Sequence, residues 1–379
     1  MADQEELNLF RDNVRRFVQN EMLPYHQQWE KDGMVPREFW NRMGDNFLLC
    51  VDVPEEYGGI GASFIHSMIV AEEISRYGCA GFCGGLTVHS DIVVHYILNS
   101  GTEEQKQYYL PKMVTGELVG AIGMTEPGAG SDLQGIRTRA VRDGDDWVIN
   151  GSKTFISNGQ HCDFVVLVTK TNPDVRGSRG TSLFIVDKSA EGFEKGTNLD
   201  KIGQHSADTS ELFFEDVRVP GTALLGSQDG GFAVMMNELP RERLSLAAVS
   251  IAGAEGVMAE TVTYVKERKA FGKAIAELQN TRFKMAEMET DVRMGRAFVN
   301  ECLERYQNQE LDNASASMAK LCTSEILGRV TDGCLQLHGG YGYMTEYPVA
   351  RAYVDARVQR IYGGTSEIMK ELIARDVLK

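Results

Sequence analysis

The chain has 379 residues, of which 42% are hydrophobic and 25% charged, and its formal net charge is −15 because 54 acidic residues outnumber 39 basic ones. This size and composition indicate a globular protein of two or three domains, and the acidic balance argues against a general binder of nucleic acid or anionic membrane surfaces. No apolar run approaches the roughly 20 residues that span a bilayer, and the acidic start shows no secretory signal, so we expect a cytoplasmic bacterial protein or, for a processed chain, one of the mitochondrial matrix.

The first region, residues 1–117, has helical periodicity. Apolar residues recur at steps of three and four between positions 7 and 17, which places them on one helix face. Pro24 is expected to end this helix, and Pro36 lies near the start of another. A later short helix is expected to end before Pro111.

The second region, residues 118–228, changes to alternating apolar residues and short apolar runs. Five segments read as strands: TRAVR, WVING, DFVVLVTKT, TSLFIVD and SELFFEDVRV. Turn signals such as Asp143-Gly144 and Asn150-Gly151 separate them. Short strands at this spacing favour a small barrel or sandwich over a parallel sheet.

The third region, residues 229–379, is helical again, with three helices of roughly 25 to 30 residues that indicate a helical bundle. Pro240 suits the first position of the first of these helices. Glu242 then lies at the third position, where a glutamate interacts favourably with the helix dipole. The fold class expected is therefore mainly α with a central β-module.

The seven cysteines are scattered, without a CxxC pair, and no histidine pair has a zinc spacing. This pattern predicts reduced, mostly buried thiols and no metal site. The cysteines are Cys50, Cys79, Cys83, Cys162, Cys302, Cys322 and Cys334.

Three segments are candidates for binding chemistry. GMTEPGAGSDLQG, residues 123–135, offers backbone N–H groups and hydroxyls for an anion or a polar ring, but it is neither GxGxxG nor GxxxxGK[ST], and a plain glycine-rich turn is the alternative. ERKAFGK places Arg268 and Phe271 on one helix face, which suits a pyrophosphate and a flat ring, unless it is an ordinary helix end.

The third segment contains two double-glycine breaks, Gly339-Gly340 and Gly363-Gly364, which allow the backbone to approach a ligand closely. Thr365 follows the second break and is expected to cap the final helix. Capping accounts for Thr365 but not for two breaks about twenty residues apart.

Together, TEPGAGSD, RKAFGK, QLHGG and the YxGT break resemble the acyl-CoA dehydrogenase family, over essentially the whole chain. The segments LFFEDVRVP and ELPRERL are most similar to its long-chain branch. The resemblance implies an N-terminal helical domain (1–117), a central β-barrel (118–228) and a C-terminal four-helix bundle (229–379), assembled as a homotetramer. It also implies FAD as cofactor, an acyl-CoA substrate and an electron-transferring flavoprotein as electron acceptor.

The resemblance assigns site residues in three groups. The residues that would line the flavin are Ile122, Gly123, Met124, Thr125, Ser131, Phe155, Ile156, Ser157, Thr365, Ser366 and Glu367. The residues that would hold the pyrophosphate and adenosine are Arg268, Phe271, Gln279, Gln336, Leu337, His338, Gly339 and Gly340. The residues that would meet the acyl-CoA are Ser131, Pro240, Arg241, Glu242, Arg243, Gly363 and Gly364.

The implied reaction removes the α-proton of a fatty acyl-CoA with a carboxylate base while the β-hydrogen leaves to FAD, giving the trans-2-enoyl-CoA. In most of the family the base is a glutamate directly before the GT of the YxGT break, and here that position is Gly363. The long-chain and isovaleryl branches supply the base from a bundle helix, at the position of Glu242. The resemblance therefore implies Glu242 as the catalytic base.

Two other functions fit the same family: an oxidase or flavin monooxygenase that uses oxygen directly, and a catalytically inactive scaffold. Acyl-chain length stays open. Gly81, Gly84 and Gly85 lie in a segment expected to shape the acyl pocket, where they leave room for a long or branched chain or only form turns.

Overall fold

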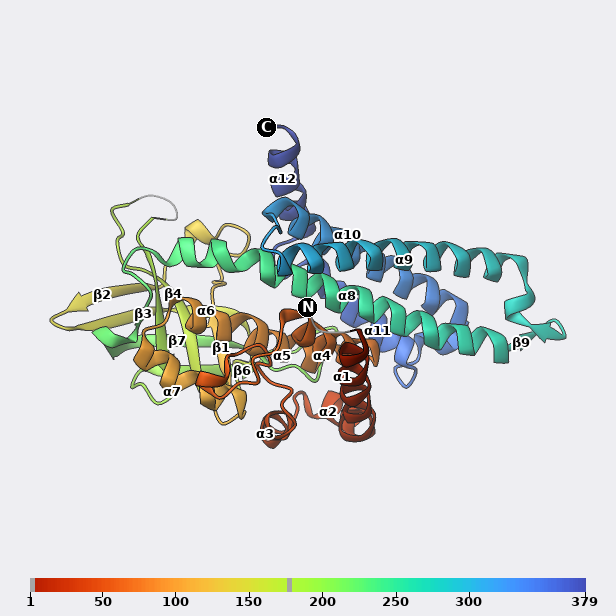
Figure 1. The fold of residues 1–379 in the computed structure, drawn as a ribbon, viewed down its shortest axis with the longest axis horizontal. Coiled ribbons are helices and arrows are strands. Elements are labelled where there is room, and N and C mark those ends of the chain that lie inside the picture. Colours follow the sequence, from red (N-terminus) through yellow and green to blue (C-terminus); the bar gives the residue numbers. More distant parts are fainter. Residues whose placement is uncertain (1–3, 176–178) are drawn as a thin grey trace.

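The computed structural model describes residues 4–175 and 179–379. Figure 1 shows the sheet at one end of the elongated molecule, with helices from both ends of the chain beside it and the long C-terminal helices extending to the other end. The helices of the first part are α1 (Gln4–Phe17), α2 (Leu23–Asp32), α3 (Arg37–Asp45), α4 (Phe64–Arg76), α5 (Ala80–Thr87), α6 (Val94–Ser100) and α7 (Glu103–Val114). Two π-helical turns, η1 (Val18–Met22) and η3 (Val88–Val93), join α1 to α2 and α5 to α6.

The predicted effects of two prolines were wrong. The chain stays helical from α1 through η1 into α2, and Pro24 occupies the first turn of α2, where a missing N–H costs little. Pro111 lies inside α7, which continues to Val114. The carbonyl four residues before Pro111 belongs to Gln107, an exposed residue that water can reach.

The central part is an eight-stranded sheet, and all five predicted strands are present. Its strands are β1 (Gly120–Gly123), β2 (Arg139–Asp143), β3 (Asp146–Ser157), β4 (Phe164–Lys170), β5 (Thr181–Asp187), β6 (Phe193–Asn198), β7 (Thr209–Pro220) and β8 (Leu224–Leu225). The pairings run in the order β6-β7-β3-β2-β4-β5-β8, and β1 pairs in parallel with β4. The sequence pattern missed β6, because FEKGTN lacks a run of apolar residues.

The last part contains three long helices that lie side by side in Figure 1, α8 (Gly231–Glu267), α9 (Gln279–Gln307) and α10 (Asn313–His338). The shorter helices α11 (Pro348–Ala356) and α12 (Ser366–Val377) follow. The most apolar 18-residue window of α8 has a mean hydropathy of 1.2, but 56% of it is buried inside the protein. Burial in the protein core therefore accounts for the apolar character of α8.

The predicted start of α8 at Pro240 was wrong, because the helix begins nine residues earlier at Gly231. Contacts with β5 determine this start: Gly230 bridges Thr181, and the N–H of Asp229 donates to Ser182 Oγ over 2.8 Å. Glu242 consequently lies in the interior of α8 and not at its N-terminus. Its expected interaction with the helix dipole is absent, and another reason is needed for a glutamate at this position.

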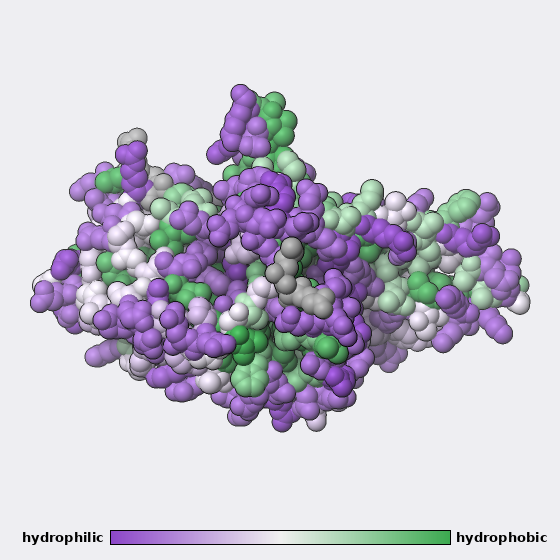
Figure 2. Space-filling model, viewed as in Figure 1, coloured by the Kyte–Doolittle hydropathy of each residue, from purple (hydrophilic) through white to green (hydrophobic). Residues whose placement is uncertain are grey.

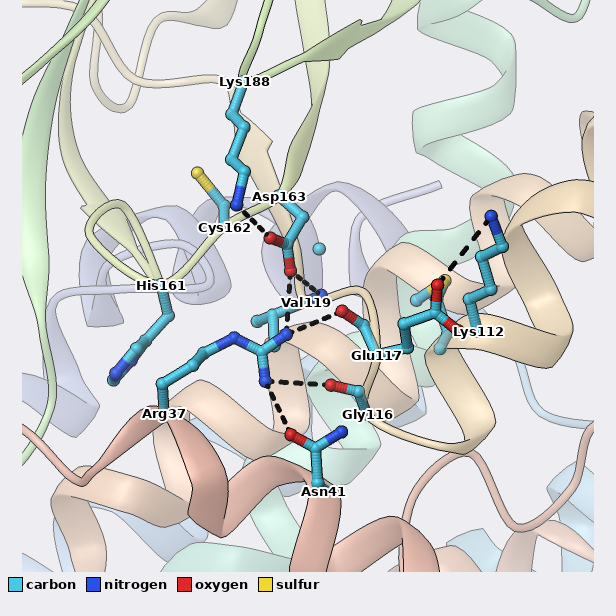
Figure 3. A network of polar contacts seen from close by, with 12 residues as sticks. Arg37, Asn41, Lys112, Gly116, Glu117, Val119, His161, Cys162, Asp163 and Lys188 are labelled. Carbon is cyan, nitrogen blue, oxygen red and sulfur yellow. Dashed lines mark hydrogen bonds and ion pairs between the residues drawn. The ribbon is translucent and has the colours of Figure 1, made fainter.

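Asp163 joins the helices of the first part to the sheet (Figure 3). Its carboxylate accepts hydrogen bonds from Arg37 on α3 (3.0 Å), from Lys188 (2.7 Å) and from the N–H of Val119 (2.8 Å). Burial raises the pKa of Asp163 and these partners lower it, with a net decrease. The ionised carboxylate is thus the form that holds the two parts together.

Replacing Asp163 by Ala is expected to lower the free energy of unfolding by about 2 to 3 kcal/mol, because it leaves the buried N–H of Val119 without a partner and removes two charge-assisted bonds. Urea titration followed by tryptophan fluorescence measures this loss. Lys188→Ala is the control and should cost less than about 1 kcal/mol, since that side chain is 54% exposed. Equal losses in both variants would contradict a central role for Asp163.

Candidate active site

Glu242 is a buried carboxylate in the middle of α8, with only 6% of the residue exposed. Its Oε1 accepts a hydrogen bond from the hydroxyl of Tyr96 on α6, over 3.0 Å. Burial raises the pKa of Glu242 to about 7, opposed by the Tyr96 hydrogen bond and by Arg243 and reinforced by Glu238. A carboxylate with that pKa is suited to accept a proton near neutral pH.

The second double-glycine break lies against α8, one turn beyond Glu242. Gly363 has φ +61° and Gly364 φ +91°, a region that favours glycine. A Cβ on Gly363 would lie 2.2 Å from Cδ1 of Leu246, which is four residues after Glu242 on the same helix face. The fold thus places Gly363 one helical turn along α8 from Glu242, so the two positions that the family resemblance offers for a base lie in the same region. At Gly363 the positive φ and the Leu246 side chain both favour glycine.

Lys320 on α10 holds the Gly363-Gly364 break in place through a hydrogen bond. The residue is 1% exposed, and its Nζ donates to the carbonyl of Gly364 over 2.6 Å. Thr365 caps α12 as predicted, because its Oγ1 accepts from the N–H of Ile368. Ser366 donates to Glu325 over 2.9 Å, and Glu367 lies in the first turn of α12 with its side chain exposed.

The two arginines beside Glu242 face different partners. Arg241 pairs with Asp52 over 2.7 Å and stacks on the ring of Phe64 at 4.1 Å, so it faces away from Glu242. Arg243 makes long bonds of 3.4 Å to Asn313 and Ser317 on α10. In the described part of the chain its Nε is buried without a hydrogen-bond partner, which leaves this donor for a ligand. Pro240 precedes both arginines inside the helix.

The glycine-rich segment after β1 is fastened to β3. Lys153 is 0% exposed, and its Nζ donates to the carbonyl of Met124 (3.1 Å) and to Glu126 (2.8 Å). The N–H of Thr154 donates to the carbonyl of Thr125 over 2.9 Å. The segment predicted to line the flavin, Ile122 to Thr125, therefore lies beside Phe155, Ile156 and Ser157 of β3, while Ser131 is exposed farther along the loop.

The predicted helix face of Arg268 and Phe271 was wrong. Helix α8 ends at Glu267, and the next residues form a two-stranded hairpin, β9 (Lys269–Ala270) and β10 (Lys273–Ala274). Phe271 and Gly272 form its tip with φ values of +53° and +80°, as a tight two-residue hairpin turn requires. Gln279 follows as the first residue of α9.

Arg268 and the end of α10 line one surface hollow of about 580 Å³. Its lining consists of Tyr264, Arg268, Ile275, Leu337, His338, Gly339, Gly340, Tyr341 and Met344. The sequence reasoning missed Tyr264, whose ring stacks on His338 with centroids 4.0 Å apart. An aromatic residue one helical turn before Arg268 was the available signal. Gln336 precedes this lining on α10.

These surfaces fit a large planar nucleotide such as FAD. Phe155 and Phe271 are 69% and 93% exposed, so both rings are available for stacking. A Cβ on Gly128, Gly130 or Gly340 would meet no atom of the described residues within 4 Å, so the backbone there is open to a ligand. The hollow offers a fixed positive charge, Arg268, beside aromatic rings.

The helix–sheet–helix fold and the open backbone segments fit the class of flavin-dependent oxidoreductases. Three family models match the chain in order: acyl-CoA dehydrogenase N-terminal domain (residues 4–117), middle domain (121–217) and C-terminal domain (229–378). The chain belongs to the acyl-CoA dehydrogenase family, whose members depend on FAD.

Individual relatives agree with this assignment. The chain is 51% identical over 374 residues to the mitochondrial long-chain specific acyl-CoA dehydrogenase of Rattus norvegicus, covering 98% of this chain and 86% of that protein. The crystal structure of acyl-CoA dehydrogenase from Geobacillus kaustophilus is 46% identical, with a TM-score of 0.97 and 99% coverage of both chains. A glutaryl-CoA dehydrogenase from Mycobacterium smegmatis in complex with FADH2 is 27% identical, with a TM-score of 0.93 and coverage of 99% and 95%.

Proposed function

We propose that this enzyme dehydrogenates long-chain fatty acyl-CoA thioesters to trans-2-enoyl-CoA, with Glu242 as the base. The observation that carries the proposal is the position of Glu242: it is buried, its pKa is raised to about 7, and it lies one helical turn from the residue that packs on Gly363. Burying a carboxylate costs free energy, and a role in proton transfer would account for keeping a glutamate at this position. We therefore favour an active enzyme over an inactive scaffold.

In the proposed mechanism the Glu242 carboxylate removes the α-proton of the bound thioester. The N–H of Gly363 donates to the thioester carbonyl as negative charge develops there, and Lys320 fixes the same turn through the Gly364 carbonyl. Bound FAD supplies the acceptor for the hydrogen that leaves the β-carbon. Glu242 is buried, and the exclusion of water from its surroundings strengthens these interactions.

Anaerobic addition of acyl-CoAs to the purified flavoenzyme tests the reaction. We expect palmitoyl-CoA to bleach the flavin faster than octanoyl-CoA, with the matching enoyl-CoA as product. Slow reoxidation in air is expected, whereas rapid peroxide formation would identify an oxidase. No bleaching with any straight or branched acyl-CoA would overturn the proposal.

Chain-length preference is proposed to depend on Gly84 of α5, a helix that contacts α8. A Cβ on Gly81 would lie 2.4 Å from Ser206 Oγ, and one on Gly85 would lie 2.5 Å from Asn158 Oδ1, so those two glycines are explained by close packing. A Cβ on Gly84 would meet Gln204 Oε1 only at 3.7 Å. Among the three glycines, Gly84 has the most space around it for an acyl chain.

Replacing Gly84 by Leu is expected to lower kcat/KM for palmitoyl-CoA by about 10-fold or more and to leave octanoyl-CoA within about 3-fold, since several methylene contacts are worth about 1 to 3 kcal/mol. Initial rates across acyl lengths measure the change. Gly84→Ala should give a smaller change in the same direction. A uniform loss across all lengths would contradict a pocket role.

The assembly and electron acceptor are also part of the proposal. Helix α12 projects from the body of the molecule (Figure 1) and carries apolar residues on its surface (Figure 2). Its last residue, Val377, is 69% exposed, and the following Leu378 is 82% exposed. An apolar projection of this kind is suited to contact other copies in a homotetramer. An electron-transferring flavoprotein as acceptor, and a bacterial cytoplasm or mitochondrial matrix as location, follow from the family.

We also infer the closure of the sheet, the helical bundle and the domain boundaries from the family. In this proposal the sheet closes as a β-barrel, and α8, α9 and α10 belong to a four-helix bundle. The corresponding domains are 1–117, 118–228 and 229–379. The sheet path from β6 to β8 and the side-by-side arrangement of the three long helices support this division.

A further inference from the structure

Helices α6 and α8 face each other through two hydrogen bonds near Glu242. Tyr96 Oη donates to Glu242 over 3.0 Å, and Asn99 Nδ2 donates to Glu238 over 2.9 Å. The donors are three residues apart on α6 and the acceptors four apart on α8, so each pair occupies one helix face. Tyr96 is 0% exposed and Glu238 8%, whereas Asn99 lies at the surface.

The two carboxylates are one helical turn apart in a region of low solvent exposure. A like charge at that distance disfavours a second negative charge, and a donor to a carboxylate favours it. Tyr96 and Glu238 therefore act on the charge of Glu242 in opposite directions. Burial has the largest influence on the pKa of Glu242 and raises it. The hydrogen bond from Tyr96 lowers this pKa, and the charge of Glu238 raises it.

We infer that Tyr96 and Glu238 are positioning residues for the base: Tyr96 holds one oxygen of Glu242 so that the other is free to face the substrate, and the charge of Glu238 increases the proton affinity of that carboxylate. The inference rests on the proposed role of Glu242. It adds two residues that belong to none of the sequence motifs. Their effect depends on contacts between α6 and α8 that the chain forms only when folded.

The remaining charged groups around this part of α8 mostly face other partners. Arg243 on α8 favours the charged form of Glu242, and Lys320 on α10 faces Arg243 and the Gly364 carbonyl. Three further groups surround Arg241 and not Glu242: Asp52, Asp91 on η3 and, through Asp52, His95 on α6. Glu238 and Tyr96 are thus the groups whose replacement should move the titration of Glu242 most directly.

The test is the pH dependence of kcat/KM for the holoenzyme and two variants, because this profile reports the ionisation of the free enzyme. Tyr96→Phe should move the acidic limb to higher pH by about 1 unit and lower kcat by about 10-fold. Glu238→Gln should move the limb to lower pH by about half a unit. Tyr109→Phe, a half-buried tyrosine that packs on Phe164, is the control and should move nothing.

The inference is supported if the acidic limb of the profile moves to higher pH in Tyr96→Phe and to lower pH in Glu238→Gln. A loss of packing alone would not move the titration of Glu242 in opposite directions in the two variants. Shifts in the same direction, or none in either variant, would overturn it. Glu242→Gln distinguishes a failure of the inference about Tyr96 and Glu238 from a failure of the proposed function. If Glu242→Gln keeps wild-type turnover, Glu242 is not the base. The midpoint of thermal unfolding, followed from pH 4 to pH 9, gives a second readout and should show the same displacement of the Glu242 titration. If Tyr96→Phe does not fold, the pH profile of Glu238→Gln alone tests the inference. This variant should fold, since glutamine has nearly the same shape as glutamate.

Discussion

Replacing Glu242 by Gln is expected to lower kcat for the best acyl-CoA substrate by about 10²- to 10⁴-fold, the usual contribution of a positioned general base. Glutamine keeps the shape of the side chain and an oxygen for the Tyr96 hydroxyl, but it cannot accept the α-proton. Single-turnover flavin bleaching measures the chemical step without product release. Turnover within a few-fold of wild type would show that another group removes the proton.

The same variant should be more stable than wild type at alkaline pH. Burial raises the pKa of Glu242 from 4.5 to about 7, so the folded protein holds this proton more tightly than the unfolded chain does. Wild-type stability therefore falls as pH rises from about 4.5 to 7, by up to about 3 kcal/mol, and stays at that lower level above pH 7. Glu242→Gln lacks this decrease. The free energies of unfolding of Glu242→Gln and wild type are compared at pH 5 and at pH 8. A Glu242→Gln variant that is less stable than wild type at pH 8 would contradict the buried, ionisable state of Glu242.

Replacing Lys153 by Met is expected to have the largest effect on cofactor retention. Lys153 is fully buried and makes an ion pair with Glu126 while it holds the carbonyl of Met124. Removing one member of a buried pair costs about 3 to 5 kcal/mol, because the other charge stays buried without compensation. We expect the variant to lose that much stability and to purify with little flavin, since residues 122–125 lose the Lys153 bond to the Met124 carbonyl and keep the backbone bond between Thr154 and Thr125.

Two comparisons make this result specific. Adding Glu126→Gln to Lys153→Met removes both charges and should recover part of the stability. The recovery is partial because the N–H groups of Arg137 and Thr138 donate to different oxygens of Glu126, and Gln keeps only one of these acceptors. Lys195→Met is the matched control: Lys195 also donates to two carbonyls but lies away from this loop. The ratio of flavin to protein in each variant measures retention. Full flavin content in Lys153→Met would contradict the anchoring role.

Much of the fold was predictable because its signals are local. Helical periodicity, strand alternation and turn residues identified the five main strands and the long helices, and all seven cysteines, which lie in the described part of the chain, are free as predicted. The errors concern prolines and helix ends. Pro24, Pro111 and Pro240 all lie within helical segments. At Pro240 the cause is tertiary, because the contact of Gly230 with β5 starts α8 upstream and outweighs the loss of one backbone hydrogen bond.

The sequence by itself determined the family and the pair of positions that matters most, Gly363 and Glu242, because both lie in recognisable motifs. Only the tertiary structure decided that Gly363 lies against Leu246, one helical turn from Glu242. It also decided which residues act on Glu242: Tyr96 is 146 positions away in the chain. Periodicity and turn chemistry depend on neighbours within a few residues, whereas burial, and with it the proton affinity of a carboxylate, depends on whichever distant elements the fold brings into contact.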